Sequence, residues 1–531
     1  MTQEQVKNML KSMTADQKTQ LIETGIKTGK LPSKYVTNDI TNLITDLLNN
    51  MEKDKESAIS ESNKDILDGQ VGHSRLFIDC YNDKLKIINN GECYYYNYMS
   101  SLWEKRDISY MLTLVSQCLT DVLTEIRAHK NYNKLTGDIV KKLDKISSQC
   151  NGVSHCEGVC KMSKAALLDT NFISTLNRTK HLLPIKNKKV IDLKTLKVRD
   201  RIQSDLFSFE LKCEYLPKSQ LTHAKQFFKS ISNNDDGVMT YLQNVLGYCM
   251  TGEVDQRCIY LFWGVGSNGK TVLIELMKDI LGNFYMTADK HMFIETKDMS
   301  SHTSFMVPLK DARLAVFSES KKKERLDMEI IKKLTGNDTI SAREIYGKQF
   351  EFKPQSKYIF LTNNLPWFNP DELSEIDRIR GTPFLARFTN NPTGDEVKKD
   401  NLFIENLRTK YLDEVFTFIC QGACEYYKYS AKNESIPMPT VVLKALEAYR
   451  IELDTVVSFT ESKCNKTNPK KYIHRSVFYD YYVKWCKDEN RLILSKSDCF
   501  KKLTSLKYEF VKHNGNVAIK GLQFNDIDEM E

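Results

Sequence analysis

One segment of the chain has the residue types and the spacing of a phosphate-binding loop. It matches the pattern G-x-x-x-x-G-K-[ST] at every fixed position and reads Gly264-Val265-Gly266-Ser267-Asn268-Gly269-Lys270-Thr271. Glycines let backbone N–H groups curl around a phosphate, and the start of a helix adds a favourable dipole potential. Lys270 would then bridge the β- and γ-phosphates of a nucleotide, and Thr271 would hold Mg²⁺. The alternative is a chance glycine-rich turn.

The elements next to this segment are the ones that such a loop needs. The apolar run Ile259–Trp263 predicts a buried strand directly before it. Apolar residues at helical spacing from Lys270 to Leu281 predict a helix directly after it. Because this strand–turn–helix context matches the motif, the sequence predicts an ATP-binding site at residues 264–271.

Two further polar residues follow apolar runs that predict core strands. The run Leu314–Phe317 leads to Ser318-Glu319, and the run Tyr358–Leu361 leads to Asn363. Carboxyl ends of parallel strands meet at one edge of a sheet, so we expect Glu319 beside the phosphate loop. There Glu319 would polarise the attacking water or help to hold the metal, and Asn363 would sense the γ-phosphate. The alternatives are an exposed strand-end glutamate and an asparagine that only starts a turn.

Basic residues between and after these strands suggest contacts with nucleic acid and with a neighbouring subunit. A hairpin that turns near Lys348 would place this lysine against a phosphate backbone, although a solvated turn is the alternative. Arg378 and Arg380 follow the third strand. An arginine that reaches the γ-phosphate held by the next subunit is a known device of ring ATPases. Both arginines remain candidates for that role.

The alternation of strands and helices over residues 258–390 predicts an α/β domain with a mainly parallel sheet. The chain is long enough for several domains. Elsewhere the pattern predicts short strands at 76–78, 85–88 and 94–96, helices over 107–180, a hairpin at 183–200, and helices at 222–250 and 401–456.

The last part of the chain, residues 457–524, predicts two helices and a hairpin. Ser495 and Asp498 nearly form a capping box at the start of the second helix, and Asn514-Gly515-Asn516 is a hairpin turn. This order resembles a winged helix, with Lys501 and Lys502 where a recognition helix meets phosphates. Residues 463–520 hold 14 Lys and Arg against five Asp and Glu, a net charge of +9 where the whole chain has +8. The alternative is a solvated, lysine-rich face.

Composition narrows the class of protein. The chain has 531 residues, of which 41% are hydrophobic and 27% charged, which is typical of a globular protein. We find no apolar stretch long enough for a membrane helix and no signal core at the start, so we expect an intracellular protein without a membrane partner. The 14 cysteines have irregular spacing, which favours reduced thiols. A cluster of Cys150, His155, Cys156 and Cys160 leaves zinc binding as the alternative to free thiols.

Taken together, these motifs resemble those of superfamily 3 helicases. The match is closest to the poxvirus-type helicase–primase family of nucleocytoplasmic large DNA viruses, shared with phage and plasmid primase-helicases. It is carried by WGVGSNGKT, LAVFSES, IKKLTGNDTISAREIYGKQFEFKP, IFLTNNLP and DRIRGTPF. It covers about residues 75–524, and residues 240–390 are the specific part.

The resemblance implies a hexameric, ATP-dependent DNA helicase with a P-loop, AAA+-like core that uses Mg²⁺. Glu319 takes the acidic motif, Asn363 the sensor and Arg378 the arginine finger, while Lys332, Lys333 and Lys348 are candidate DNA contacts. Two residues depart from the family pattern. Ser318 stands where many relatives carry a second acid, and Asp377 where they often carry an arginine. These departures keep open a non-unwinding loader that uses ATP only to assemble on DNA.

The domains expected from the resemblance follow the order of the motifs. They are an N-terminal extension (1–70), a collar or primase-docking domain (71–225), the superfamily 3 ATPase domain (226–400), a helical linker (401–456) and a winged-helix-like DNA-binding domain (457–531). The extension is too short for a primase domain, so we expect a separate primase partner. Relatives of this kind replicate DNA in the host cytoplasm, which is where we expect this protein.

Overall fold

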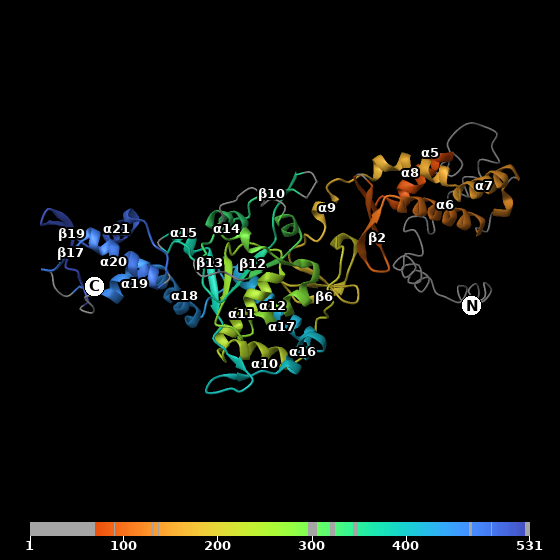
Figure 1. Cartoon of the computed structure of the whole chain (residues 1–531). Coiled ribbons are helices and arrows are strands. Elements are labelled where there is room, and N and C mark those ends of the chain that lie inside the picture. The colour runs from red at the N-terminus through yellow and green to blue at the C-terminus, as the bar shows by residue number, and fades with distance from the viewer. Residues whose placement is uncertain are drawn as a thin grey trace. The chain divides into compact units, whose positions relative to one another are not determined.

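The computed structural model describes most of the chain from Gly69 to Asn525 (Figure 1). The described residues are 69–89, 91–128, 132–135, 137–295, 305–318, 324–343, 349–370, 372–466, 470–489 and 491–525. They fall into two compact units. The first unit holds the chain up to Thr179 and Arg199–Glu210, and the second holds Lys180–Val198 and the chain from Leu211 onward.

The first unit combines a helical core with a small antiparallel sheet. Its sheet has the order β1-β2-β3. Its elements are α5 (Gly69–Tyr81), β1 (Leu85–Asn89), β2 (Glu92–Asn97), β3 (Leu102–Asp107), α6 (Tyr110–Ala128), α7 (Gly137–Cys150), α8 (Val153–Leu167) and α9 (Phe172–Thr175). The strand predicted at residues 76–78 is wrong, because these residues lie within α5. Leu76, Phe77, Cys80 and Tyr81 recur at helical spacing and are buried in one core, a pattern that a three-residue apolar run is too short to reveal.

A five-stranded parallel sheet forms the centre of the second unit, so the predicted α/β class with a parallel sheet is confirmed (Figure 1). The strand order is β13-β7-β12-β9-β8, and every pairing in it is parallel. The strands are β7 (Ile259–Trp263), β8 (Tyr285–Thr287), β9 (Leu314–Ser318), β12 (Lys357–Thr362) and β13 (Ile379–Pro383). The three inner strands are buried almost throughout, which is why each one reads as a continuous apolar run.

Helices and short strands surround this sheet in the second unit. The elements that precede or follow its strands are β4 (Leu182–Ile185), β5 (Lys189–Asp192), β6 (Lys197–Asp200), α10 (Thr222–Ile231), α11 (Asp236–Met250), α12 (Lys270–Leu281), β14 (Phe388–Thr389), β15 (Val397–Lys398), α16 (Asn401–Thr409) and α17 (Leu412–Ser430). Those between β9 and β13 are α14 (Met328–Thr335), β10 (Ile340–Arg343), β11 (Gln349–Phe352) and α15 (Leu373–Ile376). The predicted helix at Lys270–Leu281 and the predicted hairpin between β9 and β12 are therefore present.

The C-terminal part of the second unit contains the two predicted helices and the predicted hairpin. Its elements are α18 (Thr440–Leu453), α19 (Thr455–Lys463), β16 (Cys464–Asn465), β17 (Tyr472–His474), α20 (Arg475–Asp488), α21 (Lys496–Ser505), β18 (Phe510–His513), β19 (Asn516–Lys520) and β20 (Gln523–Phe524). The Ser495 side chain caps α21 by accepting the N–H of Asp498 at 3.2 Å. Positive φ angles at Asn514 and Gly515 make the tight turn between β18 and β19. The sheet order β17-β19-β18 adds a strand that the sequence pattern did not reveal.

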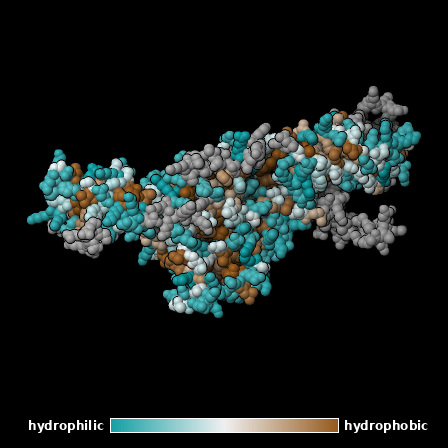
Figure 2. Space-filling view, in the orientation of Figure 1, coloured by the Kyte–Doolittle hydropathy of each residue, from teal (hydrophilic) through white to brown (hydrophobic). Residues whose placement is uncertain are grey.

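The surface is largely hydrophilic in the space-filling view, and hydrophobic side chains reach it in places over the part that carries the five-stranded sheet (Figure 2). Among the helices that the structure describes, none combines the length and the apolar character needed to cross a bilayer.

Candidate functional site

The ends of three neighbouring strands bring the predicted site residues to one edge of the central sheet. The parallel register places Trp263 beside Thr362, and Leu361 beside Ser318. Residues that follow β7, β9 and β12 therefore leave the sheet at the same edge. The chain runs from β7 through α12 to β8 at the far side, and β12 later inserts between β7 and β9. Where the order of the strands reverses in this way, a crevice forms outside their carboxyl ends, and α/β proteins bind ligands there.

The glycine-rich loop, Gly264–Thr271, connects β7 to α12 in a conformation that requires glycine at two positions. Gly264 and Gly269 have φ angles of 156° and 87°. A Cβ atom on Gly264 would lie 2.4 Å from the Phe384 carbonyl oxygen, and one on Gly269 would lie 2.5 Å from Cγ2 of Ile231. The backbone N–H of Phe388 also donates to the Ser267 carbonyl at 2.7 Å. The loop is thus held by its own backbone, by the end of α10 at Ile231 and by the segment that contains Phe384 and Phe388.

Lys270, the first residue of α12, points back across this loop. Its Nζ atom donates to the Gly264 carbonyl at 2.8 Å, to Oδ1 of Asn268 at 3.1 Å and to Oδ1 of Asn363 at 3.3 Å. The side chain is almost completely buried, and this burial lowers the pKa of Lys270 to about 8. All three acceptors are uncharged, so the ammonium group lacks an anion among these contacts. The structure therefore brings together Lys270 and Asn363, which lie 93 residues apart in the sequence.

A cavity of about 720 Å³ opens beside the glycine-rich loop. One wall is the loop and the first turn of α12, from Ser267 to Val272. The other walls come from α10, from Phe388 and from residues 397–404. Sequence reasoning missed these walls, which include Gln226, Phe227, Ser230, Phe388 and Phe403. No motif marks them, because they reach the loop only through the packing of α10 and α16.

Arg378 directly precedes β13 and Arg380 lies on it, next to β7. The N–H of Ile259, the first residue of β7, donates to the Arg378 carbonyl at 2.9 Å. Arg378 therefore lies beside the amino end of β7, at the amino edge of the sheet. The glycine-rich loop follows the carboxyl end of β7, at the opposite edge. Its guanidinium donates to Oγ1 of Thr335 at 2.7 Å, and that of Arg380 donates to the Ile436 carbonyl at 3.1 Å. Within one chain, Arg378 is thus at the wrong edge of the sheet to reach the loop.

Several other predicted site residues are outside the described residues or engaged elsewhere. Glu319 and Lys348 lie outside the described residues. Lys332 in α14 forms an ion pair with Glu372 at 3.0 Å, and Lys333 is exposed one position further on. Of the predicted nucleic-acid contacts in this region, Lys333 is the one that is exposed on α14 among the described residues. The turn between β10 and β11 lies outside the described residues.

The two predicted DNA contacts of α21 have different surroundings. Lys501 is exposed and pairs with Asp498 at 3.4 Å. The Nζ atom of Lys502 lies 2.5 Å from Oδ2 of Asp454, and both side chains are nearly buried, with 11% and 12% of each exposed. Because its ammonium is held in this ion pair, the structure disfavours Lys502 as a contact with DNA.

The cysteine-rich cluster of the first unit has the character of buried thiols. Cys150, Cys156 and Cys160 are buried, and burial raises the pKa of Cys150 and Cys160 to about 11, which favours the protonated form. His155 instead contacts His73 at 2.8 Å between ring nitrogens. Within the described ranges, we find no group of three or more residues placed to hold a metal ion. The structure therefore gives no support to the zinc alternative.

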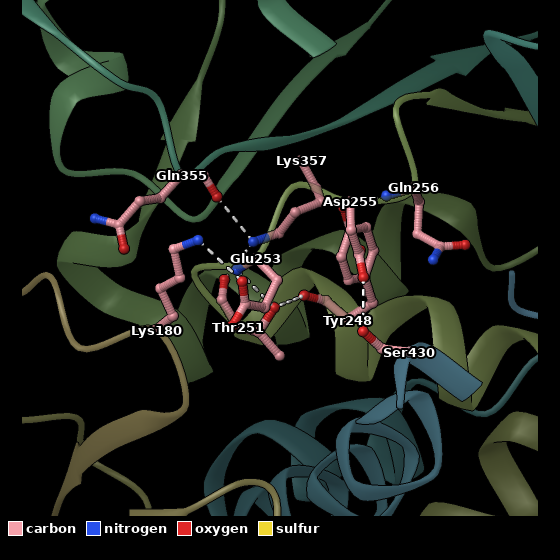
Figure 3. A network of polar contacts seen from close by, with 9 residues as sticks. All are labelled: Lys180, Tyr248, Thr251, Glu253, Asp255, Gln256, Gln355, Lys357 and Ser430. Carbon is pink, nitrogen blue, oxygen red and sulfur yellow. Dashed lines mark hydrogen bonds and ion pairs between the residues drawn. The ribbon is translucent and has the colours of Figure 1, made fainter. Parts of the chain in front are cut away.

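A second polar network, drawn in Figure 3, surrounds Lys357, whose position at the start of β12 places it at the amino edge of the same sheet. Lys357 begins β12 and is fully buried, and its Nζ atom donates to the carbonyls of Thr251, the C-cap of α11, and Gln355. Burial lowers the pKa of Lys357 to about 7. Nearby, Lys180 pairs with Glu253 at 3.0 Å. This network joins α11 to β12 and has a structural role, because the lysine satisfies carbonyls at the end of a helix.

Comparisons with known proteins find similarity to viral proteins that carry helicase and primase names. Residues 262–378 match a family described as "Family of unknown function (DUF5906)". The chain is 26% identical over 440 residues to "Putative helicase L207/L206" of Acanthamoeba polyphaga mimivirus, which covers 78% of this chain and 45% of that protein. It is 29% identical over 258 residues to "Putative helicase 022R" of Frog virus 3, covering 47% of this chain and 26% of that protein.

Two more similarities extend this set. "Putative primase C962R" of African swine fever virus (isolate Pig/Kenya/KEN-50/1950) is 23% identical over 375 residues, covering 67% of this chain and 38% of that protein. The chain therefore spans less than half the length of these curated relatives. Among solved structures, the apo C-terminal region of NrS-1 is 15% identical and covers 59% of this chain and 78% of that one, with a TM-score of 0.37.

Proposed function

The chain resembles the viral helicase–primase family, as the relatives with helicase and primase names confirm, and from this premise we propose that it is an ATP-dependent DNA helicase of viral genome replication. It would work as a ring of identical subunits that moves along single-stranded DNA. One observation carries the proposal: Lys270, which donates to Asn268 and Asn363, lines the cavity of about 720 Å³ beside the glycine-rich loop.

The residues around this cavity fit Mg²⁺-bound ATP. The Lys270 ammonium is buried among uncharged acceptors, and a triphosphate would supply the missing anion. The N-terminus of α12 adds the favourable end of a helix dipole. The hydroxyl of Thr271 would help to hold Mg²⁺, which neutralises charge on the phosphates when it is bound. Glu319 is proposed to orient the attacking water, and Asn363 to sense the γ-phosphate.

The position of Arg378 supports assembly from several subunits. It lies at the amino edge of the sheet, opposite the glycine-rich loop of its own chain. An arginine finger at this position would act on ATP held by the neighbouring subunit, as in other phosphoryl-transfer assemblies where the arginine is supplied in trans. A hexamer is the proposed form.

The basic C-terminal part supports the proposal of DNA binding. Its order of α19, β17, α20, α21, β18 and β19 resembles that of a winged helix, in which α21 would be the recognition helix. The local net charge of +9 favours a phosphate backbone. Lys333, Lys348 and Lys501 are the proposed contacts. A separate primase and a site in the host cytoplasm belong to the same proposal.

Steady-state ATP hydrolysis with and without single-stranded DNA tests the proposal. We expect DNA to stimulate hydrolysis, the protein to unwind a forked duplex, and Lys270→Ala to abolish both activities. Lys278→Ala is the matched control, because this lysine is exposed on the same helix. DNA-stimulated hydrolysis that persists in Lys270→Ala would contradict the assignment of the ATP site to the glycine-rich loop. ATP binding without hydrolysis or unwinding by the unmodified chain would favour the loader that uses ATP only to assemble.

A further inference from the structure

Helix α18 contacts the end of β7, directly before the glycine-rich loop, and the segment that follows β12. The Tyr449 hydroxyl donates to the carbonyl of Pro366, three residues beyond Asn363. The ring of Tyr449 lies 6.4 Å from that of Trp263, the last residue before the loop, and 5.6 Å from that of Phe368. Tyr449 is only 3% exposed. A displacement of either segment by a bound nucleotide would therefore reach α18 through this side chain.

The C-terminal end of α18, close to Tyr449, is joined to the proposed DNA-binding helix. Asp454 follows α18 directly and caps α19 by accepting the N–H of Val457 at 3.1 Å. The other oxygen of Asp454 pairs with Lys502 of α21 at 2.5 Å. Both side chains of this ion pair are nearly buried. A shift of the α18 end would thus move α21 with it, because breaking a buried ion pair is costly.

The packing of α18 against the sheet leaves it room to move. A cavity of about 230 Å³ lies between α18 and β13, with Phe368, Arg380, Leu443 and Tyr449 among its walls. Close-packed interiors resist small shifts, whereas a helix beside a cavity can change position with fewer lost contacts. Arg380 also donates to the Ile436 carbonyl just before α18, so the segment before the helix is tied to β13.

We propose that α18 couples the nucleotide site to the C-terminal DNA-binding part, with Tyr449 as a positioning residue for the Asn363 segment and the Asp454–Lys502 pair as the link to α21. The coupling rests on the proposed function, since it needs ATP at Lys270 and DNA at the C-terminal part. It assigns Lys502 a role other than DNA contact. Coupling of this kind is reciprocal: nucleotide changes DNA affinity by the same factor by which DNA changes nucleotide affinity.

The test measures the affinity of the full chain for single-stranded DNA with and without a non-hydrolysable ATP analogue. We expect the analogue to change the DNA Kd by about tenfold in the unmodified chain. Tyr449→Phe keeps the ring but loses the bond to Pro366, and should bring that factor close to one. It should change the affinity for either ligand alone by less than about threefold. Lys444→Gln is the control, because this lysine is exposed on the same helix and is not among the walls of the cavity between α18 and β13.

A second variant keeps the inference testable if Tyr449→Phe disturbs folding. The double variant Asp454→Asn with Lys502→Gln replaces the buried ion pair by neutral groups, and asparagine still caps α19. It should also lose the effect of the analogue on DNA affinity while it still binds DNA. An unchanged factor in both variants, or a factor of one in the unmodified chain, overturns the coupling. Failure of the proposed function differs, because the unmodified chain would then either bind neither ligand or bind ATP without hydrolysing it or unwinding a forked duplex.

Discussion

The Lys270 Nζ atom donates to Oδ1 of Asn363 at 3.3 Å, which joins the start of α12 to the residue that follows β12 at the carboxyl edge of the central sheet. Both residues were predicted to act on the same phosphate, yet nothing in their sequence spacing states that they meet. The contact makes Asn363 the partner that would report to Lys270 whether a γ-phosphate is present.

Asn363→Ala removes this partner and leaves the rest of the loop in place. We expect the rate of ATP hydrolysis to fall by about a hundredfold, the usual cost of losing one polar group that stabilises a developing charge. The Kd for nucleotide should change little, because Lys270 keeps its bonds to Gly264 and Asn268. Asn364→Ala is the matched control at the next position. Equal losses in the two variants would contradict the assignment of Asn363.

The lowered pKa of Lys270 predicts that nucleotide binding weakens at alkaline pH. Its pKa is lowered to about 8 by burial, and only the protonated form attracts phosphates. Above pH 8 binding must therefore take up a proton, so the Kd for ATP should rise toward about tenfold per pH unit. Titrations of nucleotide between pH 7 and 9.5 at constant ionic strength measure this. Lys270→Arg stays charged throughout that range, and its Kd should be independent of pH.

The position of Arg378 predicts that two inactive variants restore activity to one another. Lys270→Ala and Arg378→Ala should each lack DNA-stimulated hydrolysis. When they are mixed and allowed to assemble, about a quarter of the interfaces would pair an intact loop with an intact arginine, and activity should return in that proportion. Mixtures that stay inactive while forming rings would argue against a role for Arg378 in trans.

Lys357 predicts a dependence of stability on pH in the unit that carries the sheet. Its ordinary pKa of 10.5 in the unfolded chain falls to about 7 in the folded state, because the side chain is fully buried. Between these values the unfolded state binds the extra proton, so stability should decrease as the pH falls from 10 to 7. The slope would approach about 1.4 kcal/mol per pH unit.

Urea unfolding of the full chain at pH 7, 8 and 9, with and without Lys357→Met, measures that slope. The variant leaves the Thr251 and Gln355 carbonyls without their donor, so its absolute stability should also fall. The informative quantity is the difference in slope between the two proteins. Parallel pH dependences would mean that Lys357 keeps its ordinary pKa in the folded chain.

Much of the α/β fold was predictable because its signals are local. The strands β7, β9 and β12 are buried on both faces, so each one appears as an apolar run, and α12 follows from the spacing of its buried face. The glycines of the loop mark backbone conformations that other residues strain to adopt. Where the signal was too short, as in the apolar run Leu76–Ile78, the prediction was wrong and the segment is helical.

The sequence by itself determined the loop, its flanking elements and the resemblance to a viral helicase–primase family. Only the tertiary structure decided the strand order, the contact of Lys270 with Asn363, the place of Arg378 at the opposite edge and the burial of Lys502 against Asp454. Periodicity and turn residues act over a few residues and can be read along the chain. Which distant side chains meet depends on how whole elements pack, and that depends on the summed burial of many residues at once.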